Sequence, residues 1–413
     1  MAEFNRRKFL IAGVGAGAAG LLGGAAAIGW HELKQAADRQ PLAEGTGVLV
    51  IITLYGGNDG LSTVVPYTDP VYYSKRPDLA YAPQDVIRLD ERLGLNPGLQ
   101  GLSKVWGERK LAIVNGVSYP KPDRSHFRSM DIWQTASPSE PVSSGWIGRW
   151  LDATGDDPLR ALNLGAVLPL LVVGEKHTAS ALTGNRSPVS EQLNPVLLAL
   201  GGEDRHDTPQ MAAISAAYRA THDVGTTLAP ALGTGSPTTT FDPNAGGLNF
   251  TAGAGKNPLA DRLKTVGTCI KARVPTRVYT LTLGGFDTHA DERGTQRDLL
   301  TVLDTALTPF LADMSADLYG KNVVVMVYSE FGRRVAANAS QGTDHGTAGP
   351  VLIAGGPVKG GFYGEQPSLT DLDDGDLKGT VDFRDVYQDL LVNVLKADPE
   401  PSVGKGRREI GFM

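Results

Sequence analysis

Short, largely apolar runs recur along this 413-residue chain and are its clearest structural signal. Three of them cover residues 47–54, 277–283 and 323–328. Each has the length and β-rich composition of a strand, and such apolar runs are typical of buried strands in a parallel sheet. Residues 110–114 and 169–173 are further strand candidates. The pattern therefore predicts a central, mostly parallel β-sheet.

Helical periodicity appears between and after these runs. Leucines recur at spacings of three and four over residues 296–318, and helical periodicity returns over residues 383–395. Residues 258–271 are a further helical stretch. The helix at 296–318 separates the second strand from the third, so these elements should form a right-handed βαβ unit. Residues 225–256 are rich in Gly, Thr, Pro and Ala and predict a long loop.

Carboxylates and imidazoles follow the predicted strands. Asp59 comes after the first strand, Asp287 and His289 come after the second, and Asp344 and His345 come after the third. Ligands bind at the carboxyl ends of strands in open α/β sheets, and Asp with His is the ligand chemistry of Zn²⁺ or Mn²⁺. The alternative is that the aspartates cap helices or turns and that the histidines lie on the surface.

The N-terminus predicts export. A basic stretch at residues 5–10, which contains Arg6 and Arg7, precedes an uncharged Gly/Ala-rich stretch that ends at Gly29. This arrangement indicates an export signal over residues 1–29, and the paired arginines resemble a twin-arginine signal. We therefore expect a periplasmic or secreted protein whose transient partner is the twin-arginine translocase. A retained N-terminal anchor is the alternative.

Composition narrows the remaining possibilities. After a linker at residues 30–46, residues 47–413 are expected to form a single domain. Cys269 is the one cysteine, which excludes an internal disulfide framework and a cysteine-rich metal site. A net charge of −6 without a basic cluster beyond the signal argues against nucleic acid as a partner. No later apolar run is long enough to predict a membrane span.

The order of several motifs resembles that of a known family. Glycine-rich, acidic and histidine-containing segments follow one another at residues 56–60, 124–127, 145–150, 284–289, 329–333, 343–346 and 355–361. Together they resemble the bacterial family known as domain of unknown function 1501, which is similar to the alkaline phosphatase and sulfatase superfamily. The resemblance implies an α/β fold, an alkaline phosphatase-like three-layer sandwich with a central mostly parallel sheet. It also implies a two-metal hydrolytic centre.

The superfamily pattern also implies roles for individual residues. Asp59 occupies the place of the first metal-binding aspartate, and Ser125 matches the nucleophile at the start of a helix. His126 would be a general acid or would orient a ligand. Arg333, with Arg334 beside it, would bind an anionic group of the substrate, unless these arginines pair with neighbouring carboxylates.

Two alignments remain for the metal ligands. By position, His345 completes a zinc centre with Asp287 and His289, although the superfamily spaces the latter pair four apart rather than two. Glu330 then completes a second, oxygen-rich centre with Asp59 and Ser125, which is suited to Mg²⁺, Mn²⁺ or Ca²⁺. We favour this alignment.

By letter, Asp344 and His345 instead form the superfamily's Asp-His pair. They would then share one centre with Asp59 and Ser125, and the first centre would lack a histidine.

These features predict a secreted, metal-dependent hydrolase of phosphate or sulfate esters with a metal-activated serine nucleophile. Its substrate would be an anionic ester, with esters carried on a glycan or surface polymer among the candidates. The competing hypothesis is a non-catalytic metal-binding or surface-polymer-binding protein that retains the fold. A tightly bound transition metal would favour the first.

Overall fold

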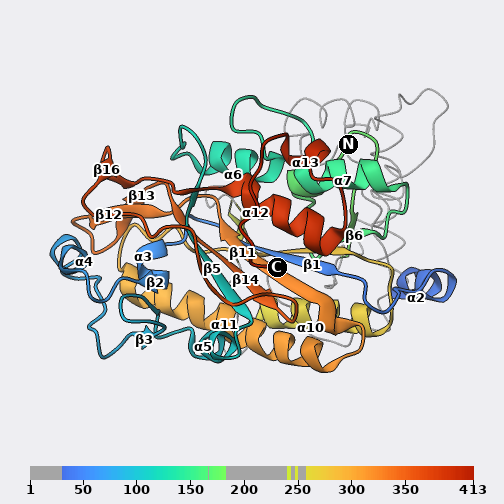
Figure 1. The fold of residues 1–413 in the computed structure, drawn as a ribbon, viewed down its shortest axis with the longest axis horizontal. Coiled ribbons are helices and arrows are strands. Elements are labelled where there is room, and N and C mark those ends of the chain that lie inside the picture. The colour runs from blue at the N-terminus through green and yellow to red at the C-terminus, as the bar shows by residue number, and fades with distance from the viewer. Residues whose placement is uncertain (1–29, 166, 183–239, 243–246, 250–256) are drawn as a thin grey trace, which may run out of the picture.

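The computed structural model describes residues 30–165, 167–182, 240–242, 247–249 and 257–413 (Figure 1). The expected signal at 1–29 lies outside these residues, as does most of the expected loop at 225–256. Within that loop, β8 (Thr240–Asp242) and β9 (Gly247–Asn249) pair as an antiparallel hairpin. The fold is otherwise organised around one large sheet.

A nine-stranded sheet forms the centre of the fold. Its middle consists of β11 (Val323–Ser329), β1 (Val48–Leu54) and β10 (Val278–Leu283), with β1 parallel to both neighbours. β6 (Ala161–Asn163) and β7 (Ser180–Ala181) extend it in parallel beyond β10. The predicted parallel centre is therefore present.

The opposite half of the sheet is mixed. β14 (Gly349–Gly355) runs antiparallel to β11 and to β5 (Leu111–Ser118). β15 (Gly361–Tyr363) and β18 (Val381–Asp382) both pair in parallel with β5. Because two antiparallel steps separate β5 from β11, β5 runs in the same direction as the central strands, and its end lies at the same edge of the sheet.

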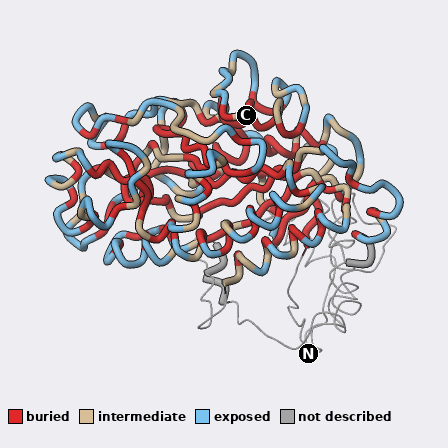
Figure 2. Tube along the Cα trace, turned by 60° about the horizontal axis from the view of Figure 1, so that its bottom comes forward, coloured by how far each residue is buried: buried red, intermediate tan, exposed pale blue. Residues whose placement is uncertain are grey.

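Helices cover both faces of the sheet. β1 requires this, because its side chains alternate between the two faces and all of them are buried. Val48, Val50 and Ile52 face a core shared with α2 (Trp30–Arg39), α5 (Gln100–Gly107), α10 (Pro258–Lys271) and α11 (Glu292–Ala316). Leu49 and Ile51 face a second core shared with α6 (His126–Thr135), α7 (Trp146–Thr154) and α12 (Phe383–Leu390). Figure 2 shows buried residues gathered in the interior and exposed residues along the periphery. The predicted α/β class with flanking helices is confirmed.

The remaining elements lie at the ends of these layers. α3 (Gly60–Thr63), α4 (Pro70–Lys75) and β2 (Val64–Val65) contribute to a smaller apolar cluster, and β2 forms a three-stranded sheet with β4 (Gly94–Leu95) and β3 (Ile87–Arg88). β12 (Arg333–Ala337) pairs with β13 (Thr343–His345), and β16 (Leu372–Asp373) pairs with β17 (Asp376–Leu377). The short helices η3 (Gly320–Asn322), η4 (Leu391–Leu395) and α13 (Glu400–Val403) complete the fold.

Two local expectations differ from the structure. Residues 169–173, a strand candidate, instead contain the 3₁₀ helix η2 (Leu170–Val172), because the chain closes turn bonds there rather than joining a ladder. Residues 30–46, expected as a linker, include α2, whose Leu33 and Ala37 are buried in the core. A short apolar run does not distinguish helix from strand by itself.

Length and composition alone would allow α11 to cross a membrane. In this structure α11 packs along the sheet through Leu300, Leu303 and Leu307. It follows the loop after β10, which belongs to the region described next.

Candidate metal centre

The loops that follow β1, β5, β10 and β11 meet at one edge of the sheet. Leu54 at the end of β1 is in register with Leu283 of β10 and with Ser329 of β11. The residues just beyond these ends therefore emerge side by side. β5 delivers α6 to the same edge, and the β12–β13 hairpin folds back over it.

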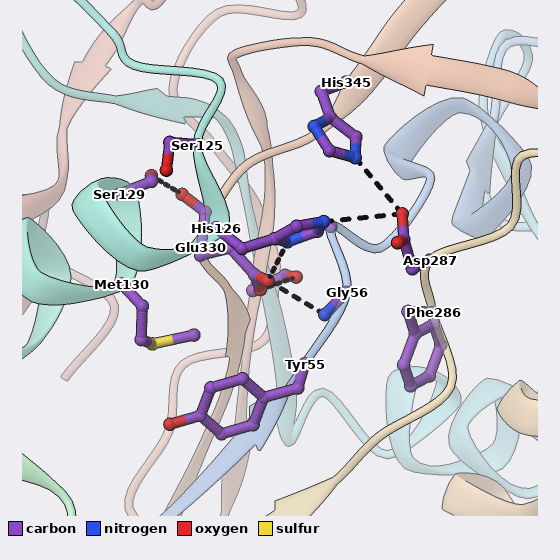
Figure 3. A network of polar contacts seen from close by, with 12 residues as sticks. Tyr55, Gly56, Ser125, His126, Ser129, Met130, Phe286, Asp287, Glu330 and His345 are labelled. Carbon is purple, nitrogen blue, oxygen red and sulfur yellow. Dashed lines mark hydrogen bonds and ion pairs between the residues drawn. The ribbon is translucent and has the colours of Figure 1, made fainter. Parts of the chain in front are cut away.

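Three imidazole nitrogens surround one carboxylate oxygen at this edge. Oδ1 of Asp287 lies 3.0 Å from Nε2 of His289, 3.1 Å from Nε2 of His345 and 3.4 Å from Nε2 of His126. The Nε2 atoms of His289 and His345 are themselves 2.9 Å apart. Figure 3 shows the rings of His126 and His345 turned toward Asp287. We call these four residues the His/Asp cluster.

The opposite ring nitrogens of the three histidines face oxygen atoms. Nδ1 of His126 lies 2.8 Å from Oε1 of Glu330, and Nδ1 of His345 donates to the main-chain carbonyl of Arg124 at 2.8 Å. Nδ1 of His289 lies 3.6 Å from Oδ1 of Asp344. A histidine that keeps its proton on Nδ1 presents a lone pair on Nε2, which is the arrangement of metal-ligating histidines.

Glu330 is held rigidly behind His126. Its side chain is buried, and Oε1 also accepts the N–H of Gly56 at 2.9 Å, while Oε2 accepts the Ser329 hydroxyl at 2.9 Å. Gly56 has φ of +118°, and a Cβ there would lie 2.3 Å from the nitrogen of Asp287. Only glycine allows the loop after β1 to approach both carboxylates this closely.

Arg333 connects the loops after β1 and β10 with β13 through hydrogen bonds. Its buried guanidinium donates to the carbonyls of Gly57 at 2.7 Å, Thr343 at 2.9 Å and Phe286 at 3.0 Å, and to that of Gly56. It also donates to Oδ1 of Asp287 at 2.7 Å. Its donors are used inside the protein, so Arg333 positions Asp287; of the two roles that the sequence left open, the structure shows the pairing with a neighbouring carboxylate.

The pKa values of the cluster residues are shifted from their ordinary values. Burial by itself would lower the pKa of His126, but the neighbouring carboxylates of Asp287 and Glu330 raise it to about 9. Burial would raise the pKa of Asp287, but the neighbouring His126, His345 and Arg333 hold it well below its usual range. Burial and the nearby Arg333 lower the pKa of His289. The carboxylates thus favour a positive charge at the centre of the cluster.

The donor set fits a transition-metal ion. His126, Asp287 and His345 offer ligand atoms that all lie within 4.8 Å of one another. Nε2 of His126 is buried and has no hydrogen-bond partner among the residues that the structure describes. Imidazole nitrogens with one carboxylate oxygen suit Zn²⁺.

Asp59, expected as a metal ligand, lies in a different environment. It is fully buried, caps α3 by accepting the N–H of Leu61 at 3.2 Å, and forms an ion pair with the equally buried Arg76. Burial raises its pKa, but Arg76 outweighs this effect and lowers the pKa to about 2. Burial and the neighbouring Asp59 raise the pKa of Glu292 to about 9. The oxygens of Asp59 are thus used within this pair.

Ser125 is exposed at the N-cap of α6, and its side chain makes no capping hydrogen bond. In Figure 3 it lies on the other side of His126 from Asp287. The oxygen-rich set of Asp59, Ser125 and Glu330 is therefore not assembled as expected. The rival set is not assembled either, because Asp344 faces Nδ1 of His289 and Asp59 forms its ion pair with Arg76.

The structure assembles Asp287, His289 and His345, the set of the favoured alignment, and adds His126. The sequence suggested only acid or orienting roles for His126. Its position just after a strand that runs with β1 was the available signal. The carbonyl of Arg124 left no signal, because a main-chain contact does not depend on residue type.

Comparison with known proteins agrees with the family resemblance. The family described as "Protein of unknown function (DUF1501)" matches residues 200–405. The sequence has no detectable relative among curated proteins.

Solved structures with a related fold include a protein in the alkaline phosphatase superfamily from Vibrio parahaemolyticus. It shares 10% identity at a TM-score of 0.41, over 88% of this chain and 70% of that one. The lipoteichoic acid synthase LtaP from Listeria monocytogenes shares 9% identity at a TM-score of 0.38, over 92% and 80%. A variant of TAB5 alkaline phosphatase with Mg bound shares 11% identity at 0.35, over 78% and 95%.

Proposed function

Since the resemblance to the DUF1501 family is confirmed, we propose that this chain is a metal-dependent hydrolase of phosphate or sulfate esters. The observation that carries the proposal is the convergence of three Nε2 atoms on Oδ1 of Asp287. In His126 and His345 the opposite ring nitrogen lies 2.8 Å from an oxygen atom, an arrangement that tertiary packing for its own sake does not require.

His126, Asp287, His289 and His345 would hold the ion, with Zn²⁺ the best match to this donor set. The ion would supply positive charge to the ester oxygens and lower the pKa of a hydroxyl nucleophile. Glu330 orients His126, and Arg333 keeps Asp287 ionised and in place. Ser125 is the proposed nucleophile because its hydroxyl is exposed, free of a capping bond, and adjacent in sequence to His126.

One observation favours a second candidate, a non-catalytic metal-binding or surface-polymer-binding protein. The oxygen-rich set is dispersed, with Asp59 paired to Arg76 and Glu330 bound to His126. A single ion can nevertheless support ester hydrolysis, and so the hydrolase remains our proposal.

The test combines metal analysis with a substrate screen. The purified protein should hold a transition metal at about one ion per chain by elemental analysis, the occupancy of a single centre of this type. It should also hydrolyse p-nitrophenyl phosphate, its diester or p-nitrophenyl sulfate, and a chelator should abolish turnover until Zn²⁺ or Mn²⁺ is restored. Bound metal without turnover on any ester would favour the binding protein. Absence of metal would contradict the hydrolase and leave only a surface-polymer-binding protein.

Export is a separate part of the proposal, and it rests on residues 1–29 of the sequence. Replacing Arg6 and Arg7 by lysine should leave folded precursor in the cytoplasm, because paired arginines are the expected recognition element. Cell fractionation measures the outcome, and a normal periplasmic yield would refute the twin-arginine route.

A further inference from the structure

Two arginines beside the His/Asp cluster face a pair of aspartates that the proposed reaction does not use. Arg124 directly precedes Ser125 and His126, and its carbonyl holds Nδ1 of His345 at 2.8 Å. Arg334 directly follows Arg333, at the start of β12. Their side chains are 39% and 33% exposed, so both guanidinium groups reach solvent close to the cluster.

The aspartates belong to the tight hairpin β16–β17. Asp373 pairs with Asp376, and the two turn residues Asp374 and Gly375 have φ of +50° and +85°. Positive φ at both positions is the geometry of a two-residue hairpin turn, for which Asp-Gly is a preferred sequence. The turn therefore holds Asp374 at a defined position. In Figure 1 the hairpin lies beside β12 and β13.

The hairpin is fixed to the same framework as the cluster. The hydroxyl of Thr347, two residues after His345, donates to the carbonyl of Leu377 at 2.6 Å. Leu377 is buried in an apolar cluster with Val335 of β12. The hairpin therefore keeps its position relative to the metal ligands through both its backbone and its core.

The two aspartates contact the arginines in different ways. Asp376 is 1% exposed, accepts from Nε of Arg124 at 2.8 Å, and has its Oδ1 3.6 Å from Nε of Arg334, so it is a buried counter-ion of both arginines. Asp374 is 77% exposed, and its Oδ2 lies 2.9 Å from Nη2 of Arg124 and 3.6 Å from Nη2 of Arg334. The contacts of Arg334 are too long for hydrogen bonds. One exposed carboxylate thus faces two guanidinium groups without satisfying both.

We propose that Arg124 and Arg334 form an anion subsite for a second charged group of a polyanionic ligand, and that Asp374 occupies this subsite until the ligand displaces it. An exposed ion pair contributes little to stability, so a ligand can displace Asp374 at small cost. A sulfate or phosphate group offers several oxygens to the two planar guanidinium groups, whereas Asp374 places one oxygen between them. The ligand class is a molecule with several sulfate or phosphate groups.

The role of this subsite in choosing substrates rests on the proposed hydrolase, but its capacity to bind anions does not. The test is therefore direct binding by isothermal titration calorimetry to the full-length mature protein treated with a chelator. Sucrose octasulfate and inositol hexakisphosphate are the probes for sulfate and phosphate ligands, and sucrose is the uncharged control. Loss of turnover in the hydrolase assay leaves this measurement unaffected.

Asp374→Asn should tighten binding of at least one polyanion about fivefold, because it removes the competing charge, and Asn also accepts positive φ. Arg334→Gln should weaken binding about tenfold. Arg334 is the better arginine to replace, since Arg124 also positions His345. Asp373→Asn is the matched control, because it removes the same charge from the same hairpin and its residue has no ion pair with either arginine in the structure.

Tighter binding by Asp374→Asn but not by Asp373→Asn, with weaker binding by Arg334→Gln, would support the subsite. The response to the two probes identifies sulfate or phosphate as the preferred group. Equal effects of the two aspartate substitutions would show that binding responds only to the net charge of the protein, and would overturn the proposal. An unchanged affinity in Arg334→Gln, or no binding of either polyanion by any variant, would also overturn it.

Discussion

Nδ1 of His126 lies 2.8 Å from Oε1 of Glu330, a carboxylate that is 1% exposed. This contact turns Nε2 of His126 toward Oδ1 of Asp287, which is 3.4 Å away. A buried glutamate just past the end of β11 thus sets the direction of a ring that begins a helix some 200 positions earlier in the chain. The relationship makes Glu330 a positioning residue rather than a ligand.

Glu330→Gln should accordingly weaken metal binding about tenfold without removing a ligand, because glutamine keeps the volume but not the charge that orients and polarises His126. Competition with a chromogenic chelator measures the affinity. The variant should keep the stoichiometry of the wild type at saturating metal. Equal affinity of the two proteins would show that the contact does not support the site.

Removal of any one cluster histidine should have a larger effect. Alanine at position 126, 289 or 345 takes away one of the converging Nε2 atoms, and each variant should lose the same metal, with affinity reduced by at least about a hundredfold. Elemental analysis after dialysis measures this loss. His177→Ala is the control, since His177 lies in a loop held by Asp152 through its main-chain N–H. Retention of metal in the His126 variant would remove that residue from the ligand set.

Asp59→Asn tests the buried ion pair. Asparagine can still cap α3, but Arg76 loses its charged partner, so the free energy of unfolding should fall by roughly 3 kcal/mol while the folded protein keeps its metal. Urea denaturation and metal analysis give the two readouts. Asp69→Asn is a matched control, because Asp69 caps α4 through Val71 and has no described ion pair. Metal loss in the Asp59 variant would restore it as a ligand.

The pH dependence of stability should reveal Glu292. Its pKa rises from an ordinary value of 4.5 to about 9 in the folded protein, so between these values the folded state binds a proton that the unfolded state has released. This contribution makes the free energy of unfolding fall as pH rises, by up to about 1.4 kcal/mol per pH unit, and it levels off above pH 9.

Glu292→Gln removes that contribution, so its stability should depend less steeply on pH over the same window. Urea denaturation from pH 5 to about 9, with chelator present to exclude metal binding, compares the two proteins. Parallel pH profiles for the wild type and the variant would contradict a protonated Glu292.

Ser125→Ala should abolish turnover of any ester that the wild type cleaves, while leaving metal content and thermal stability nearly unchanged, because an exposed hydroxyl without a capping bond contributes little to folding. Ser74→Ala, at an exposed serine of α4, is the control. Full activity in the Ser125 variant would assign the nucleophile elsewhere. Ser62 and Thr63 are 1% exposed and would need the structure to open before they could act.

Local pattern was sufficient for the elements that carry the fold. The apolar runs that became β1, β10 and β11 are strands, and the periodic stretch that became α11 is a helix, because burial on both faces and burial on one face leave different spacings in a sequence. The same logic placed Asp287 and Glu330 just beyond strand ends, where parallel pairing brings them together. Pattern failed at Leu170–Val172, where a short apolar run fits a turn as well as a strand.

The sequence by itself therefore determined the α/β class, the central strands and which acids and histidines lie at the sheet edge. Only the tertiary structure decided which of them share a centre. Asp59 forms a buried ion pair with Arg76, and Arg333 donates its hydrogen bonds to main-chain carbonyls. His126 is oriented toward the cluster by Glu330. These outcomes depend on contacts between residues far apart in the chain and on backbone atoms, and neither leaves a periodic or compositional trace in the sequence.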